Sequence, residues 1–267
     1  MPLSPVVQPY DQLILDLDGV VWIGPDAVPG AVAAIDALRA GGKRVAFATN
    51  DPRRPEEDYV ARLWRIGVRA SLADVVTVGG ATQHLLAETR SGRTAFVIGT
   101  PSMHRHVADA GLRVLNGTDL ATRAEVVVVG GTEDLTYAHL RDASLALRRG
   151  ADFLATGRDP TYPQPDGLWP GTGAIVAALE YATGRAAAIV GKPEPQLFLT
   201  ALDRLGEGRT LVVGDNLEMD IVAAREAGLD AALVLSGHTT AEDAARDGDH
   251  PPPVTVAESL AALVAAS

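Results

Sequence analysis

The segment LILDLDGVVW, residues 13–22, carries two aspartates directly behind a short apolar run. Such a run has the composition of a strand that is buried in a sheet, and Gly19 permits a sharp turn out of it. Side chains two positions apart on an extended strand point to the same side, so Asp16 and Asp18 are expected to share one face. Carboxylates held together repel each other unless a cation bridges them or one is protonated. The segment predicts a catalytic pair, with one carboxylate as nucleophile and the other as general acid and base, or else an ordinary turn with two solvated aspartates.

Strand-like and helix-like runs alternate outward from this segment. Apolar positions with helical spacing over 30–40 are followed by a strand-like run at 44–48 and a second helical stretch at 55–66. The last third of the chain repeats this alternation, with strands expected at 187–190, 210–213 and 231–235 and helices at 196–205 and 219–227. Strands that alternate with helices predict an α/β fold with a Rossmann-like parallel-sheet core.

The middle of the chain predicts a second α/β domain. Further strand–helix units begin at 95–98 and 126–129, and a strand at 153–156 precedes a loop rich in Pro, Gly and Asp at 157–171. A loop of that length in a compact protein is usually functional. The expected division is a catalytic core, residues 1–92 and 186–267, and an inserted α/β cap domain, residues 93–185.

Bulk composition excludes several classes of function. The formal net charge is −11, and the sequence has no basic face of the kind that general nucleic-acid binding requires. The chain has no cysteine, which excludes disulfides, thiolate zinc sites and a cysteine nucleophile. The sequence has no apolar run long enough to span a membrane and does not begin with a signal-peptide pattern, so we expect a cytoplasmic protein without a membrane partner. The oligomeric state is left open, a homodimer included.

Polar side chains follow three further predicted strands. Thr49 and Asn50 end one strand, where backbone N–H groups at a helix start could hold a phosphate oxygen; a helix cap is the alternative. Lys192, one of two lysines in the chain, could neutralise a carboxylate and hold a phosphoryl oxygen, or could lie at the surface. Asp215 and Asp220 offer the hard oxygen ligands that suit Mg²⁺, with helix capping as the alternative. Open α/β sheets bind ligands at such strand ends, and the combined order favours one shared site.

This order of motifs resembles the haloacid dehalogenase superfamily of phosphatases over nearly the whole chain. The closer resemblance is to the subgroup with a large α/β cap inserted between the second and third motifs, which includes NagD-type and 4-nitrophenyl phosphatase-like enzymes. Three segments are similar to that subgroup's cap loop and its return to the core: ATGRDPTYP (155–163), PGTGAIVAALEYATGR (170–185) and VGKPEPQLF (190–198). The resemblance implies a Mg²⁺-dependent hydrolase that acts on a small phosphorylated metabolite.

The resemblance also implies roles for residues of the core. Asp16 would be the nucleophile that forms an aspartyl-phosphate, and Asp18 would protonate the leaving oxygen and later activate water. Thr49 and Lys192 would hold the phosphoryl group. The Mg²⁺ ion would be bound by Asp16, by the backbone carbonyl of Asp18 and by Asp215.

Four further residues are expected around this centre. Asp220 would orient the groups that surround the metal. Asn50 is the expected substrate contact beside the motif-two threonine. In the cap loop, Asp159 and Tyr162 match positions near the leaving group of the substrate.

The second motif departs from the subgroup's pattern. Asn50 is followed by Asp51 and Pro52, where the subgroup often has a second Asn and then Ser or Thr. Asp51 adds a negative charge near the phosphate, and Pro52 removes an N–H donor. We expect Asp51 to cap a helix with Pro52 at its first position.

The sequence argues against some rival functions and leaves others open. A phosphonate hydrolase of the same fold would need a cap lysine, and no lysine occurs between Lys43 and Lys192. A dehalogenase has no need of Asp18 as leaving-group acid, and a signalling receiver would carry its motifs in another order. A phosphomutase of the same fold and a non-catalytic metabolite-binding module stay open. Glycerol phosphate, phosphoglycolate, a nucleotide and a phosphosugar all stay open as substrates.

Overall fold

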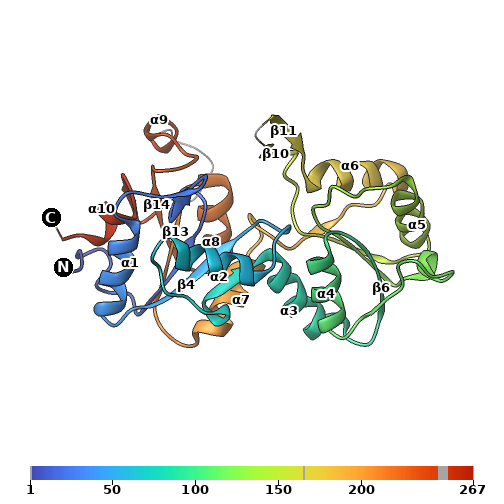
Figure 1. The fold of residues 1–267 in the computed structure, drawn as a ribbon, viewed down its shortest axis with the longest axis horizontal. Helices are drawn as coiled ribbons and strands as arrows, with labels where there is room; N and C mark the ends of the chain where they lie inside the picture. Colours follow the sequence, from blue (N-terminus) through green and yellow to red (C-terminus); the bar gives the residue numbers. More distant parts are fainter. Residues whose placement is uncertain (1, 165, 246–251, 267) are drawn as a thin grey trace. The chain divides into compact units, whose positions relative to one another are not determined.

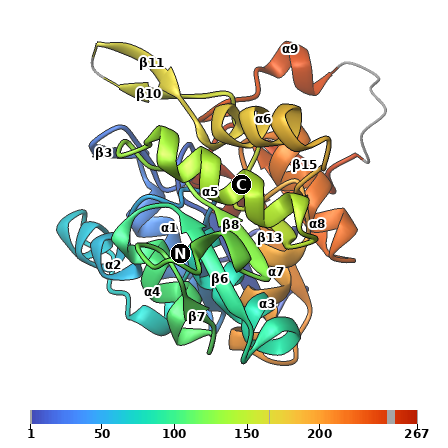
Figure 2. The same ribbon diagram turned by 90° about the vertical axis from the view of Figure 1, so that its right-hand side faces the viewer.

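The chain divides into two compact units, each built on a sheet of its own. The computed structural model describes residues 2–164, 166–245 and 252–266. The first unit comprises Met1–Thr49, Glu56–Val76 and Lys192–Ser267, and the second comprises Asn50–Pro55 and Thr77–Gly191. Figure 1 and Figure 2 label many of the helices and strands of each unit. The predicted α/β class, a Rossmann-like parallel core with an inserted α/β domain, is confirmed.

A six-stranded sheet forms the centre of the first unit, in the order β15-β14-β13-β1-β4-β5. Its strands are β1 (Gln12–Asp16), β4 (Arg44–Thr49), β5 (Val75–Thr77), β13 (Thr210–Gly214), β14 (Asp230–Val234) and β15 (Thr255–Ala257). Strand β1 pairs in parallel with β4 and β13, and β14 pairs in parallel with β13 and β15. All residues of β1 are buried, as expected for a central strand covered on both faces.

Helices cover this sheet because its strands alternate apolar side chains between two faces. Leu13 and Leu15 join one core cluster with residues of α1 and α10, whereas Ile14 points to the face on which α7 packs. The helices of the unit are α1 (Ala31–Ala40), α2 (Glu56–Arg65), α7 (Gln196–Leu205), α8 (Val222–Glu226), α9 (Ala241–Ala244) and α10 (Leu260–Val264). A short hairpin, β2 (Trp22–Ile23) with β3 (Asp26–Ala27), a 3₁₀ turn, Leu72–Asp74, and a π-helical turn, Leu217–Ile221, also belong to it.

The second unit has a five-stranded parallel sheet in the order β12-β9-β8-β6-β7. Its strands are β6 (Thr94–Ile98), β7 (Arg113–Val114), β8 (Val126–Val129), β9 (Asp152–Ala155) and β12 (Ala188–Ile189). Its helices are α3 (Val78–Arg90), α4 (Pro101–Asp109), α5 (Tyr137–Arg148) and α6 (Thr172–Thr183), with a 3₁₀ turn at Ala121–Arg123. Helices α5 and α6 lie together on one side of the sheet, and α3 and α4 lie together on the other (Figures 1 and 2). None of the helices that the structure describes has both the length and the apolar character needed to cross a membrane.

The division into units differs from the expected boundaries at 92/93 and 185/186. Helix α3 packs against α4 and therefore belongs to the second unit. The expected core strand at 187–190 is β12, which pairs with β9 at the edge of the second sheet. Lys192 therefore follows a strand of the second unit, although its own side chain belongs to the first. A short apolar run has the same pattern whichever sheet it joins, so the sequence alone did not show that this strand belongs to the second sheet rather than the first.

Two other local expectations also changed. The long loop at 157–171 contains an antiparallel hairpin, β10 (Thr161–Gln164) with β11 (Gly167–Pro170). Asp51 does not cap a helix, because α2 begins only at Glu56. Instead, the Asp51 carboxylate accepts hydrogen bonds from the backbone N–H of Arg53 at 3.0 Å and from its guanidinium at 2.7 and 3.1 Å. The helix that was expected directly after Asp51 starts four residues later than Pro52, so its first N–H groups lie too far along the chain for this side chain to cap them.

Candidate active site

Three parallel strands end at one edge of the six-stranded sheet. Asp16 is the last residue of β1 and pairs in register with Ala48 of β4, so that Thr49 ends the neighbouring strand beside it. On the other side of β1, strand β13 ends directly before Asp215. The carboxyl ends of parallel strands form the ligand-binding edge of such sheets. The strand register therefore brings two carboxylates and a buried threonine to one place.

A buried lysine lies between two of the carboxylates. The Lys192 Nζ atom donates hydrogen bonds to Asp16 Oδ1 at 2.8 Å and to Asp220 Oδ1 at 2.6 Å. Lys192 is 5% exposed and Asp220 1% exposed, so the ion pairs are shielded from water. Burial alone would lower the pKa of Lys192, but the charges and hydrogen bonds of Asp16 and Asp220 outweigh burial and raise it. The ammonium is therefore a fixed positive charge in the site.

Asp220 is held by the turn that follows β13. It lies in a π-helical turn, Leu217–Ile221, whose first residues are capped by the side-chain oxygen of Asn216. Asp220 Oδ2 accepts the backbone N–H groups of Asp215 at 3.2 Å and of Asn216 at 3.1 Å, while its Oδ1 accepts Lys192. Asn216 is the capping residue, so neither aspartate is needed as a cap. Both Asp220 oxygens are bound by protein donors, as expected for a residue that orients its neighbours.

Two glycines allow the Asp215 carboxylate to approach the backbone closely. Its Oδ2 accepts the backbone N–H of His238 at 2.5 Å. A Cβ atom would lie 2.0 Å from Asp215 Oδ2 at Gly237 and 2.3 Å from it at Gly19. Burial and then the charge of Asp220 raise the pKa of Asp215 to about 6. The carboxylate is thus fixed in a crowded position where its charge is costly.

The carboxylate cluster fits a divalent cation. Oxygens of Asp16, Asp215 and Asp220 lie within 4.8 Å of one another, and all three residues are buried. Burial raises the pKa of Asp16 well above its ordinary value against the opposing effect of Lys192, and the carboxylates of Asp220 and Asp215 add to the rise. With every group ionised, three carboxylates and one ammonium leave a net charge of −2. Mg²⁺ matches that charge and prefers carboxylate oxygens. Because Asp220 is occupied by protein donors, Asp16 and Asp215 are the residues that would hold the ion.

Asp18 lies outside this cluster. Strand β1 ends at Asp16, so the geometry of an extended strand does not extend to Asp18, which is exposed. Its Oδ1 accepts the indole N–H of Trp22 at 2.9 Å. The Trp22 ring is fully buried and has the Arg62 guanidinium 3.9 Å from its centroid. Sequence reasoning missed Trp22 as the residue that orients Asp18; an aromatic residue just behind the acidic turn was the available signal.

The three residues expected to contact the substrate, Asn50, Asp159 and Tyr162, all lie in the second unit. Asn50 packs against Gly191, where a Cβ atom would lie 2.2 Å from its Oδ1. Asp159 is exposed, and its carbonyl accepts the backbone N–H of Gly173 at 2.9 Å. The Tyr162 hydroxyl donates to a carboxylate of its own unit. Their contact with a substrate stays a prediction.

The raised pKa values predict that protons and Mg²⁺ compete for the cluster. A carboxyl group whose pKa is raised on folding stabilises the metal-free fold at low pH and loses that contribution as pH rises through the folded value, about 6 for Asp215. Metal binding must displace these protons. We expect the dissociation constant for Mg²⁺, measured by calorimetry or by thermal shift, to rise up to about tenfold per displaced proton for each pH unit below 6.

The control for this measurement is Asp215→Asn, which should respond weakly to Mg²⁺ at every pH. Equal Mg²⁺ affinity of the unmodified protein at about pH 5 and about pH 7.5 would contradict the assignment of the cluster.

Comparison with known proteins places the chain among phosphatases. The haloacid dehalogenase-like hydrolase family matches residues 13–113, and a HAD-hydrolase-like family matches residues 189–263. D-glycerol 3-phosphate phosphatase of Mycobacterium tuberculosis is 37% identical over 91% of this chain and 67% of its own length. Acid sugar phosphatase of Staphylococcus aureus is 32% identical over 88% of this chain and 90% of its own length.

Solved structures agree over almost the whole chain. The crystal structure of glycerol phosphate phosphatase from Mycobacterium tuberculosis in complex with magnesium has a TM-score of 0.90 and 36% identity, covering 98% of this chain and 78% of that one. Structures of NagD from Escherichia coli and of a Thermotoga maritima 4-nitrophenylphosphatase are also similar, at 30% and 31% identity. The two family matches, the two parallel sheets and these relatives all indicate the same family. The chain belongs to the haloacid dehalogenase-like hydrolases, in the phosphatase subgroup of NagD and 4-nitrophenylphosphatase.

Proposed function

We propose that the protein is a Mg²⁺-dependent phosphomonoester hydrolase that works through a phosphorylated Asp16. The observation that carries the proposal is the buried Lys192 ammonium, bonded at once to Asp16 and to the orienting Asp220. Phosphoryl transfer is catalysed mainly by positioning and by electrostatic stabilisation. An anionic nucleophile must meet an anionic phosphate, and a fixed cation beside that nucleophile reduces their repulsion.

The proposed reaction has two halves. An Asp16 oxygen attacks phosphorus, the bond from phosphorus to the ester oxygen breaks, and Asp18 gives that oxygen a proton. Asp18 then takes a proton from water, the water oxygen attacks phosphorus, and inorganic phosphate leaves with Asp16 restored. Thr49 and Lys192 hold the non-bridging phosphoryl oxygens during both halves. Bound Mg²⁺ supplies positive charge that favours the approach of phosphate to the carboxylate.

The surroundings of Asp18 support its proposed role as general acid and base. Its carboxylate is exposed, so it is not tied into the buried ion pairs. The indole of Trp22 holds one of its oxygens at 2.9 Å, which leaves the side chain oriented without a charged partner there. A carboxylate in this setting can exchange protons with an ester oxygen and with water.

The substrate class follows from the relatives and from the charge of the site. Two of the similar proteins are named D-glycerol 3-phosphate phosphatase and acid sugar phosphatase. We propose a small phosphorylated metabolite of the same kind, with glycerol phosphate and phosphosugars ahead of phosphoglycolate and nucleotides. The second unit would act as the cap that selects among them. Its expected contacts with the leaving group are Asp159 and Tyr162.

Removing the nucleophile tests the proposal most simply. Asp16→Asn should leave a folded protein whose release of phosphate from 4-nitrophenyl phosphate and glycerol 3-phosphate falls by at least about 10³-fold, because amide oxygen is a poor nucleophile. Asp26→Asn, a change of the same kind on the exposed β3, should leave turnover unchanged. Turnover of Asp16→Asn within tenfold of the unmodified enzyme would refute the nucleophile assignment.

The role of Asp18 predicts a change in the time course. 4-Nitrophenolate leaves without a proton, so Asp16 of the Asp18→Asn variant should still be phosphorylated by 4-nitrophenyl phosphate. The rate at which water hydrolyses the phosphorylated Asp16 should fall by about 10²–10⁴-fold, because no base activates the water. Rapid-mixing absorbance should then show a burst of one 4-nitrophenolate per enzyme followed by slow turnover. A normal steady rate without a burst would assign the acid and base work to another residue.

A further inference from the structure

The second unit contains a cavity in whose lining the proposed phosphatase chemistry gives a role only to Tyr162, as a contact with the leaving group. It has a volume of about 290 Å³ and lies among the β10–β11 hairpin, α6 and the loop that follows β8. Its lining is Thr132, Glu133, Leu135, Tyr162, Trp169, Pro170, Ala174, Ile175 and Ala178. This volume is at the small end of the range for ligand pockets, and a mostly apolar lining with a few polar groups is typical of them.

One wall of the cavity is an aromatic pair whose polar atoms are both hydrogen-bonded. Tyr162 and Trp169 are directly opposite each other in the hairpin, and their rings meet edge to face with centroids 6.4 Å apart. The Trp169 indole N–H donates to Asp166 Oδ1 at 2.8 Å, and the Tyr162 hydroxyl donates to Glu133 Oε1 at 3.0 Å. The Arg53 guanidinium lies 4.2 Å from the Tyr162 centroid. A wall fixed in this way reduces the ordering that a ligand must impose on binding.

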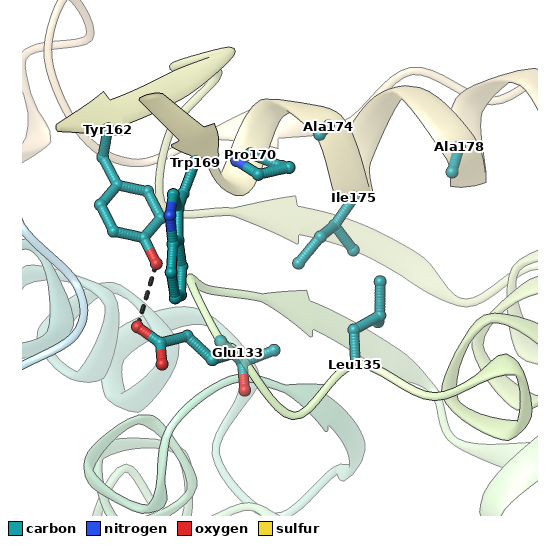
Figure 3. A pocket seen from close by; sticks show the side chains of 9 residues that line it. Glu133, Leu135, Tyr162, Trp169, Pro170, Ala174, Ile175 and Ala178 are labelled. Carbon is teal, nitrogen blue, oxygen red and sulfur yellow. Dashed lines mark hydrogen bonds between the residues drawn. The ribbon is translucent and has the colours of Figure 1, made fainter. Parts of the chain in front are cut away.

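The opposite wall is aliphatic. Leu135 and Ile175 face the indole of Trp169 across the open space, with Pro170, Ala174 and Ala178 along the edge formed by α6 and its start (Figure 3). Trp169 is 37% exposed and Leu135 is 38% exposed, so both have apolar surface that a ligand could cover. Burying that surface under a flat ring or a short alkyl chain would be favourable.

The one charged residue in the lining, Glu133, determines which polar group of a ligand the cavity favours. Glu133 accepts one hydrogen bond, from Tyr162, and among the described residues no other hydrogen bond or ion pair to its carboxylate occurs. None of the nine lining residues is cationic, and the whole chain has a net charge of −11. The Tyr162 ring already contacts the Arg53 guanidinium, so the Trp169 indole is the ring that would attract an ammonium group beside Glu133. A phosphate ester in this cavity would be repelled by Glu133.

We propose that this cavity is a binding site for a small organic cation. The ligand would have an ammonium group at Glu133 and an aromatic or short aliphatic body between Trp169 and Ile175. The proposal uses only contacts within the second unit and does not depend on the phosphatase assignment.

Calorimetric titration with three compounds of one shape tests the charge preference. Phenethylamine carries the ammonium, 2-phenylethanol is neutral and phenylacetate is an anion. Phenethylamine should bind at one saturable site, at least about tenfold more tightly than 2-phenylethanol, and phenylacetate should not bind measurably. Absence of saturable phenethylamine binding up to about 10 mM, or binding of phenylacetate as tight as that of phenethylamine, would overturn the proposal.

Three variants test the location. Glu133→Gln keeps an acceptor for Tyr162 but removes the charge, and should weaken phenethylamine binding about tenfold or more. Asp119→Asn removes an equal charge from an exposed position of the same unit and should leave binding unchanged. Ala178→Phe, at an exposed helix position, should fill the cavity and abolish binding. Unchanged affinity in both Glu133→Gln and Ala178→Phe would overturn the site, whereas a phosphatase assay on the same preparations bears only on the proposed function.

Discussion

A single ammonium group makes the cluster of acids in the first unit possible. Asp16, Asp215 and Asp220 are all buried, and carboxylates buried together repel one another strongly. Lys192 compensates part of that repulsion through direct bonds to Asp16 and Asp220. The remaining excess of negative charge is what gives the site its affinity for a divalent cation. In a protein with a net charge of −11, this local arrangement is also what can accept an anionic substrate.

The fold supplies this arrangement through the register of parallel strands. Because β1, β4 and β13 run in the same direction, Asp16, Thr49 and Asp215 reach one edge from positions far apart in the chain. The π-helical turn behind β13 then points Asp220 back toward the strand ends. Gly237 and Gly19 leave room for the Asp215 carboxylate against the backbone. The groups proposed for catalysis are thus carried by strands of the core and by the turn behind β13, which suits chemistry that depends on position.

Local patterns in the sequence were sufficient to predict the central strands of the first unit, but not to predict where that unit ends. The apolar runs before Asp16 and Asp215 predicted buried parallel strands, and the order of the polar residues behind them identified the family. The strand at 187–190 was assigned to the wrong sheet because an apolar run does not encode its pairing partner. Asp51 was expected to cap a helix, but the next helix begins only at Glu56, and the carboxylate binds the backbone N–H and the guanidinium of Arg53. Such choices depend on three-dimensional neighbours, which a single sequence does not display.

The same limit applies to the side chains around the site. The acidic pair of the first motif was expected on one face of a strand, but β1 ends at Asp16 and Trp22 holds Asp18 in a separate, exposed position. This separation gives the two carboxylates different environments. Asp16 is buried beside a cation and Asp18 is exposed, which agrees with the nucleophile and acid–base roles that we propose for them. The two carboxylates of one motif therefore lie in different surroundings, which supports the different roles proposed for them.

A double-mutant cycle between Lys192 and Asp220 is the most direct test of the central interaction. Free energies of unfolding would be measured in metal-free buffer near neutral pH for the unmodified protein, Lys192→Met, Asp220→Asn and the double variant. Lys192→Met should cost about 3–5 kcal/mol, because it leaves buried carboxylates without their cation. The double variant should be more stable than the sum of the single effects by about 1–3 kcal/mol. Single effects that add within about 0.5 kcal/mol would contradict the account of Lys192 as the charge that holds this site together.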